Sequence, residues 1–203
     1  VDVHAVAAPF KFSKPPGPLE EILGAKETYG SAPFQPMDAI FRASVPSMDE
    51  GWTRYIWDEK ELKYGQLREP DVKSGRLTYS LHPGVSMIYR SIIIPDQPAR
   101  TIFNGYRSGL MPKELTDGLG EQGVNALRQF VEAGGVLVCL NRASDFAIEQ
   151  FKLPIRDVVA GLPRTQFYVP GSILRLELDT THPIATGMPK DSIAWVEESP
   201  VFE

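Results

Sequence analysis

The sequence predicts an α/β domain built on a mostly parallel, doubly wound sheet. Strand-like and helix-like segments alternate from residue 38 to residue 151, as they do in doubly wound folds. In addition, the segment 89–97, YRSIIIPDQ, contains three consecutive isoleucines, which suits a strand that is buried on both faces of a parallel sheet. At 203 residues the chain is long enough for one substantial domain and an appendage.

An irregular, proline-rich arm or interdomain linker is predicted over residues 1–37. Pro15, Pro16 and Pro18 surround Gly17, and these residues favour extended backbone. No positively charged and apolar leader opens the chain, so we expect no signal peptide. The folded domain is expected to cover residues 38–203.

The first strand is predicted over 39–47 and the first helix over 48–59. Ser47 precedes the helix and Glu50 follows three residues later, which is the pattern of a capping box. Trp52, Tyr55 and Ile56 recur at helical spacing and predict a stripe that faces the core.

The later elements follow from similar patterns. Segments 63–69 and 136–140 predict a short strand and a buried strand. The segment 120–135 predicts an amphipathic helix that buries Val124, Leu127 and Val131 and ends at Gly134. A short helix with Ser144 as its N-cap is expected over 144–151. Alternation over 172–179 predicts a late strand, and the turn-rich HPIATGMP follows it.

Ligands of doubly wound sheets bind beyond the carboxyl ends of the strands, where the winding reverses. The candidate pocket residues lie in the loops after the predicted strands and in FNGYRSG: Asp49, Glu50, Asp96, Gln97, Asn104, Arg107, Asn141 and Ser144.

Two of these groups have a specific chemistry. Asp49, Glu50 and Asp96 could form a carboxylate cluster for acid–base work or a divalent cation; alternatively they cap a helix and accept loop amides. Asn104 and Arg107 could bind a carboxylate-bearing ligand through the guanidinium fork, or could belong to a solvated turn.

Several segments resemble a known family. SMDEGWTRYI, IIIPDQ, FVEAGGVLVCLNRASDFAIEQF, FYVPGSILRLELDTTHPIATGMP and EESPVF resemble the class I glutamine-amidotransferase-like domain attached to bacterial zinc-carboxypeptidase-like proteins. The resemblance covers roughly residues 38–203 and implies a flavodoxin-like three-layer sandwich. It also implies a parent protein, exported to the periplasm or beyond, with a metallopeptidase domain upstream as the neighbour of this one.

Amidotransferase chemistry needs a cysteine at a sharp strand-to-helix turn and a later His-Pro-Glu. In VLVCLNRAS the nucleophile position falls on Leu140, so Cys139 lies one residue early and should point into a packed layer. His182 is followed by Pro183 and then by Ile184, where a carboxylate is needed. We therefore expect no catalytic residues; an amidase that uses Cys139 and His182 is the rival.

Other chemistries receive less support. None of His4, His82 and His182 has glutamate three residues later, so a peptidase zinc site is not expected within the chain. Ser47 and Ser144 are better explained as helix caps than as nucleophiles. No cofactor is expected.

Charge and composition limit the partners. The net charge is −5, and no dense Lys/Arg cluster or long apolar stretch occurs, so neither nucleic acid nor membrane insertion is expected. The sequence favours an accessory domain that contributes interdomain packing, oligomer contacts or ligand recognition. A small-molecule or sugar-binding domain with a pocket lined by Asp96, Asn104 and Asn141 is a further alternative.

Overall fold

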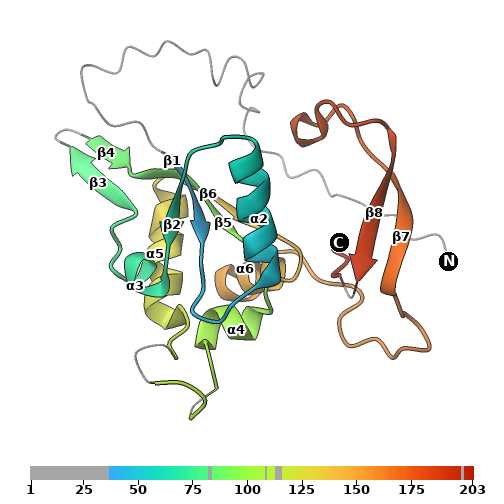
Figure 1. The fold of residues 1–203 in the computed structure, drawn as a ribbon, viewed down its shortest axis with the longest axis horizontal. Coiled ribbons are helices and arrows are strands. Elements are labelled where there is room, and N and C mark those ends of the chain that lie inside the picture. Colours follow the sequence, from blue (N-terminus) through green and yellow to red (C-terminus); the bar gives the residue numbers. More distant parts are fainter. Residues whose placement is uncertain (1–36, 82–83, 108, 113–115, 198) are drawn as a thin grey trace. The chain divides into compact units, whose positions relative to one another are not determined.

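The computed structural model describes residues 37–81, 84–107, 109–112, 116–197 and 199–203. The chain divides into an α/β unit, residues 33–155, and a unit that contains residues 156–203 (Figure 1). The predicted arm over 1–37 therefore falls almost wholly outside the described residues. The domain predicted over 38–203 covers the described part of both units.

A four-stranded sheet forms the centre of the α/β unit, with the strand order β2-β1-β5-β6. Every neighbouring pair in it is parallel. The strands are β1 (Met37–Phe41), β2 (Tyr64–Leu67), β5 (Tyr89–Ile94) and β6 (Val136–Cys139). The helices are α2 (Met48–Glu59), α3 (Glu69–Lys73), α4 (Ala99–Asn104), α5 (Gly120–Glu132) and α6 (Ala143–Phe151). The predicted mixed α/β fold with a parallel sheet is confirmed.

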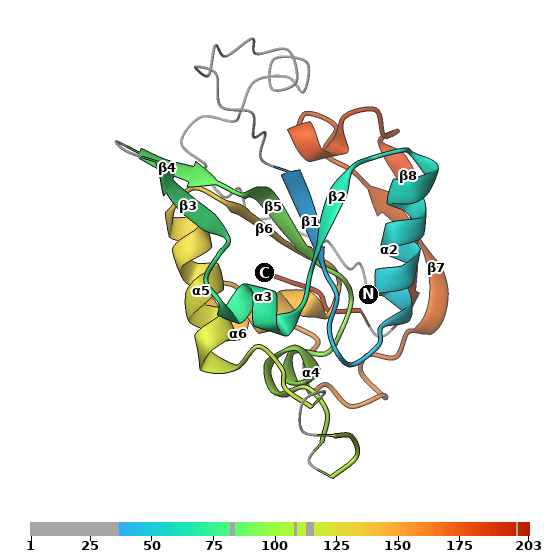
Figure 2. The ribbon, with the colours of Figure 1, turned by 60° about the vertical axis from the view of Figure 1, so that its left-hand side comes forward.

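Both faces of the central strands are buried, as the isoleucine run predicts. Ile92 and Ile94 belong to the main hydrophobic core, together with residues of α3, α4, α5 and α6. Ile93 points to the opposite face and is only 8% exposed. On that face Trp57 of α2 packs edge-on against Tyr64 of β2. Figure 2 shows α2 and α5 on opposite sides of the sheet.

Helix α2 has the predicted bounds but exposes the face that the sequence assigned to the core. The Ser47 hydroxyl accepts a hydrogen bond from the Glu50 amide at 3.4 Å, so the N-cap prediction is confirmed. Trp52, Tyr55 and Ile56 are 57%, 54% and 55% exposed, so the core-facing stripe is wrong. Helical spacing identifies an apolar stripe but not the surface that it meets, and here Trp57 makes the contact with the sheet.

Helix α5 supplies the centre of the core. Val124 and Leu127 are buried as predicted, but Phe130 is buried where Val131 was expected, and Val131 is 43% exposed. The helix ends at its C-cap, Ala133, and is followed by a left-handed Gly134 with a φ of 102°, which confirms the predicted stop.

Truncation of an α5 side chain and of an α2 side chain should therefore have very different costs. Phe130→Ala removes a fully buried ring and is expected to lower the free energy of unfolding by about 3–5 kcal/mol. Trp52→Ala removes an exposed side chain and should change it by less than about 0.5 kcal/mol. Urea denaturation of both variants measures the difference. A large loss from Trp52→Ala would mean that α2 packs through its apolar stripe after all.

Three short elements of the α/β unit escaped sequence analysis. These are α3, α4 and an antiparallel hairpin of β3 (Thr78–Leu81) and β4 (Gly84–Met87). The two helices have five and six residues, too few for a periodic pattern to stand out.

The unit that contains residues 156–203 is built on an antiparallel pair, β7 (Pro170–Glu177) and β8 (Asp191–Glu197). A short 3₁₀ helix, η2 (Pro183–Ala185), lies in the connection between them. The predicted strand over 172–179 matches β7, whereas β8 was not predicted. Ile173 and Trp195 lie opposite each other in the register. Both are more than half exposed.

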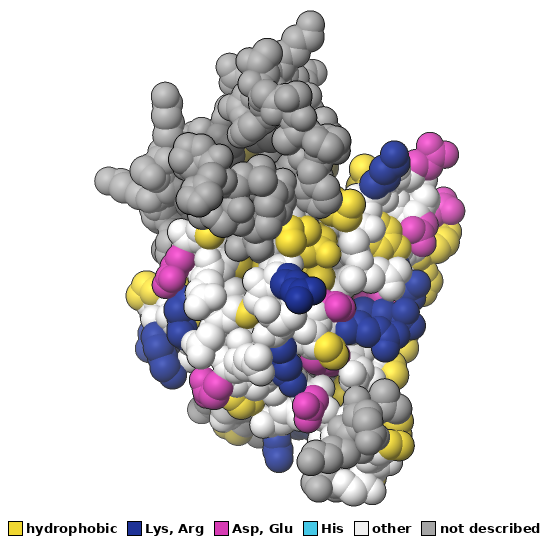
Figure 3. All heavy atoms as spheres, turned by 90° about the vertical axis from the view of Figure 1, so that its left-hand side faces the viewer, with side chains coloured by type: hydrophobic (Ala, Val, Ile, Leu, Met, Phe, Trp, Pro, Cys, Tyr) yellow, Lys and Arg dark blue, Asp and Glu magenta, His cyan; other side chains and the backbone are white. Residues whose placement is uncertain are grey.

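The surface carries charges of both signs. On the face drawn in Figure 3, Lys and Arg side chains lie in small separate groups with Asp and Glu among them. In the part of the chain that the structure describes, no helix is long and apolar enough to cross a bilayer.

Candidate functional site

The loops after β1 and β5 meet at the point where the strand order reverses, which is where a doubly wound sheet usually binds its ligand. Here the two loops are joined directly. The Ser47 hydroxyl donates to the Asp96 carbonyl at 2.8 Å, and the Gln97 side-chain amide donates to the Val45 carbonyl at 2.8 Å. These polar groups of the two loops therefore bond to each other.

Asp96 is bound by a residue that the sequence analysis missed. Arg142, at the start of α6, donates to the Asp96 carboxylate from its backbone amide at 3.1 Å and from its guanidinium at 3.0 Å to each oxygen. Asn141 immediately before it has a φ of 50°, a conformation that Asn tolerates well. The carboxylate of Asp96 thus fixes the turn after β6.

The other acidic residues near these loops also have internal roles. Glu50 is buried and pairs with Arg54 at 2.7 Å, so its carboxylate does not complete the predicted capping box. Glu69, which the sequence analysis did not select, accepts from the Ser44 amide and hydroxyl at 2.5 and 3.0 Å. Asp49 is exposed in the first turn of α2. Among the described residues, no group of three or more His, Cys, Asp or Glu side chains could hold a metal ion.

A small pocket of about 190 Å³ lies beside these residues. It is lined at the carboxyl end of β1 by residues that include Ser44, Ser47 and Glu50, together with Arg42 and Arg68. Because Ser44 and Ser47 bond to Glu69 and Asp96, and Glu50 bonds to Arg54, the polar groups of this pocket are largely satisfied within the protein.

Cys139 ends β6, opposite Ile94 of β5. The register places the half-buried side chain against the hydrophobic core, in the packed layer predicted from the sequence. Burial raises the pKa of the Cys139 thiol to about 12, because a thiolate is poorly solvated among apolar side chains. Such a thiol is almost wholly protonated at neutral pH and is a poor nucleophile.

Ser144 is not the N-cap of α6, contrary to the sequence prediction. The N-cap is Arg142, and Ser144 lies inside the first turn of the helix. Its hydroxyl donates to the Cys139 carbonyl at 3.2 Å. This hydroxyl therefore ties the helix to the end of β6.

His182 belongs to the other unit, where it caps η2. Its Nδ1 atom accepts a hydrogen bond from the Ile184 amide at 3.2 Å, and the side chain is exposed. The lone pair of Nδ1 is thereby used within the turn.

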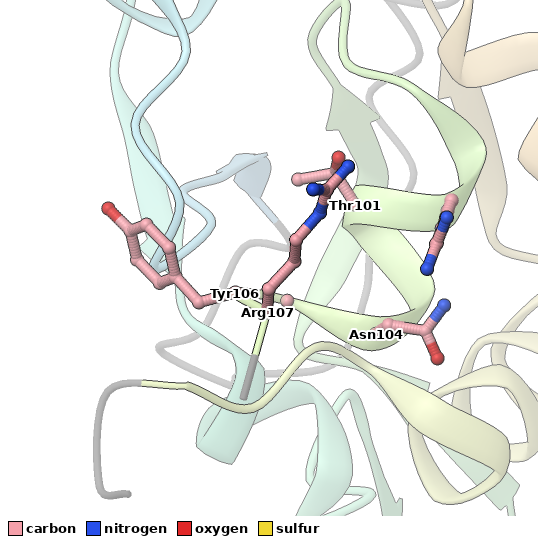
Figure 4. Close-up of a pocket in the computed structure, with 6 residues that line it drawn as sticks. Thr101, Asn104, Tyr106 and Arg107 are labelled. Carbon is pink, nitrogen blue, oxygen red and sulfur yellow. The ribbon is translucent and has the colours of Figure 1, made fainter. Parts of the chain in front are cut away.

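A second, larger pocket lies beside α4. Its volume is about 390 Å³, and its lining residues are Arg100, Thr101, Asn104, Gly105, Tyr106 and Arg107. Figure 4 shows the Arg107 side chain extending along α4 toward Thr101, while the Tyr106 ring points away from it. Of the predicted pocket residues, only Asn104 and Arg107 line this cavity.

The loop that carries Arg107 is fixed at its base by two glycines. Gly105 has a φ of 72°, and a Cβ atom there would lie 2.2 Å from the Thr116 carbonyl oxygen. A Cβ atom on Gly118 would lie 2.4 Å from the Gly105 nitrogen. The Tyr106 amide also donates to the Thr116 carbonyl at 3.0 Å. The two ends of the loop can approach this closely only because neither position carries a side chain.

Comparisons with protein-family models, with curated proteins and with solved structures found no match for this chain.

Proposed function

We propose that the chain is a non-catalytic, amidotransferase-like accessory domain of a zinc-carboxypeptidase-like protein. The strand order β2-β1-β5-β6 supports the flavodoxin-like part of this proposal, because the corresponding strands of flavodoxin-like sheets have the same order. The sequence segments that resemble the amidotransferase-like family support the rest. The parent protein is then an exported hydrolase, and the neighbouring metallopeptidase domain carries the chemistry.

The observation that carries the proposal is the position of Cys139. A working amidotransferase holds its thiolate at the mouth of the site, beside a base. Cys139 instead packs against the core, and burial raises its pKa to about 12. His182, the base of the rival amidase, uses Nδ1 to cap η2. The rival function, an amidase that uses Cys139 and His182, would require the opposite of both observations.

The exposed apolar face of α2 supports a packing role for the accessory domain. Met48, Trp52, Tyr55 and Ile56 are all more than half exposed along one side of the helix. Aromatic and aliphatic side chains gathered in this way are typical of protein interfaces. The neighbouring metallopeptidase domain is the partner that we propose for this face.

The small-molecule alternative is supported by one of the three residues that were expected to line its pocket. The pocket beside α4 contains Asn104, whereas Asp96 and Asn141, which were expected to line the same pocket, do not line it. Recognition without turnover at that pocket is compatible with an accessory role. It would add ligand binding to interdomain packing.

Assays for glutamine and amide hydrolysis test the absence of catalysis. We expect the wild-type chain and the Cys139→Ala variant to release ammonia from glutamine, and from simple amides, at the rate of the buffer alone. A wild-type rate above background that is abolished by Cys139→Ala would overturn the proposal in favour of the amidase. A circular dichroism spectrum of the variant controls for its folding.

A further inference from the structure

We propose that the pocket beside α4 binds a small dianion whose negative charge lies on oxygen atoms, as in a dicarboxylate or a phosphate. The inference rests on the proposed function in one respect, because it takes the ligand to be bound and not converted. Three features support it: the lining residues, the charges that surround them and the backbone contacts at the base of the loop.

The pocket wall is cationic and polar. Arg100 and Arg107 contribute two guanidinium groups, Thr101 and Asn104 contribute a hydroxyl and an amide, and none of the lining residues is acidic. Ile102 is buried in the core, so the opposite side of α4 carries Arg100 and Asn104, which are neighbours at i and i+4. Arg107 approaches from the loop (Figure 4). Positive charge thus reaches the pocket from two separate elements.

Both guanidinium groups lack a carboxylate partner among the described residues. Other arginines are neutralised locally: Arg54 by Glu50, Arg90 by Asp38 and Arg142 by Asp96. Asp117, at the base of the loop, pairs with Lys73 at 3.4 Å. Two like charges on one cavity repel each other, and an anion placed between them removes that repulsion.

Backbone contacts at the base of the loop hold the segment just before Arg107 against the residues that follow the loop. The Gly105–Asp117 bridge and the bond from the Leu119 amide to the Ile102 carbonyl at 2.9 Å close the loop onto α4. A site whose groups are already ordered loses less conformational entropy on binding. Arg107, two residues after Gly105, lines the pocket.

These groups select the chemistry of the ligand. A guanidinium donates two parallel hydrogen bonds to a carboxylate or to two phosphate oxygens. Two guanidinium groups match a ligand with two negative charges, and Asn104 and Thr101 can donate to further oxygen atoms. The volume of about 390 Å³ is at the small end of ligand pockets. Nucleic acid fits poorly, because the pocket is small and the net charge is −5.

Isothermal titration calorimetry of the full chain at low ionic strength tests the proposal. Succinate and glutarate represent dicarboxylates, inorganic phosphate represents the alternative source of the charge, and acetate is the monoanion. We expect saturable binding of a dicarboxylate or of phosphate that is tighter than that of acetate. Arg100→Gln and Arg107→Gln should each weaken it at least tenfold, because each removes a charge-assisted pair.

Arg76→Gln is the matched control. Arg76 is exposed in the same unit and lines neither pocket, and its replacement removes the same charge. Binding that Arg76→Gln weakens as much as Arg107→Gln would show non-specific attraction and overturn the proposal. Absence of binding by all the dianions at millimolar concentration would also overturn it. Neither of these binding results bears on the reactivity of Cys139. The proposal of a non-catalytic domain is tested separately, by the assays for glutamine and amide hydrolysis.

Discussion

Replacing Gly105 by alanine is expected to destabilise the α/β unit strongly and to disrupt the pocket beside α4. Two costs add at this position. With a φ of 72° and a ψ of −143°, Gly105 has a backbone conformation that is essentially restricted to glycine, and a residue with a side chain there costs about 1–3 kcal/mol. The new Cβ atom would also lie 2.2 Å from the Thr116 oxygen and 2.5 Å from the Gly118 nitrogen. Backbone atoms cannot move aside as a side chain can, so overpacking adds about 1–3 kcal/mol.

Gly75→Ala is the control for a positive φ without a close contact. Gly75 has a φ of 69°, but nothing lies within 4 Å of a Cβ atom built there. We therefore expect this variant to lose only the conformational part, about 1–2 kcal/mol. Urea denaturation gives both free energies of unfolding, and titration with the dianion reports on the pocket. Equal losses in the two variants would contradict the close approach of Gly105 to Thr116.

The central strands and the long helices could be predicted because their patterns are local. The bounds of α2 were predicted to the residue from the Ser47 cap and the helical run that follows it. The isoleucines of β5 are buried on both faces as expected for a parallel sheet. In each case a few residues that are neighbours in the sequence determine the secondary structure and the burial of the segment.

Tertiary contacts could not be read from such patterns. Trp52 and Ile56 have the spacing of a core stripe, yet α2 contacts the sheet through Trp57 and exposes them. A stripe of this kind equally suits a surface that meets another domain. Likewise, Asp96 was selected as a ligand-binding group, but it binds Arg142, which is 46 residues away in the sequence.

The sequence identified only some of the residues that line the pocket beside α4, because the others depend on a helix that was not predicted. Asn104 and Arg107 drew attention because they occur in a short glycine-containing loop with polar side chains. Arg100 was missed because α4 itself was not predicted, and only its helical conformation places Arg100 beside Asn104. The spacing of four residues was visible in the sequence, but the helix that gives it meaning was not.

Iodoacetamide should alkylate Cys139 far more slowly in the native protein than in the urea-unfolded chain. The thiolate is the reactive species. A rise in the pKa from 9.0 to about 12 lowers the thiolate fraction about a thousandfold at neutral pH. Steric shielding by the core adds to this effect. Because Cys139 is the only cysteine of the chain, mass spectrometry of the intact protein gives its rate without ambiguity.

The pH dependence of the native rate distinguishes burial from local unfolding and from activation. If reaction occurs from the folded state, the rate should rise tenfold per pH unit up to about pH 12. If it occurs through local opening, the rate should level off near the pKa of an unfolded thiol and fall with added stability. Either profile keeps Cys139 as a packing residue. A native rate above the unfolded rate, with a plateau at neutral pH, would identify an activated thiolate and revive the amidase.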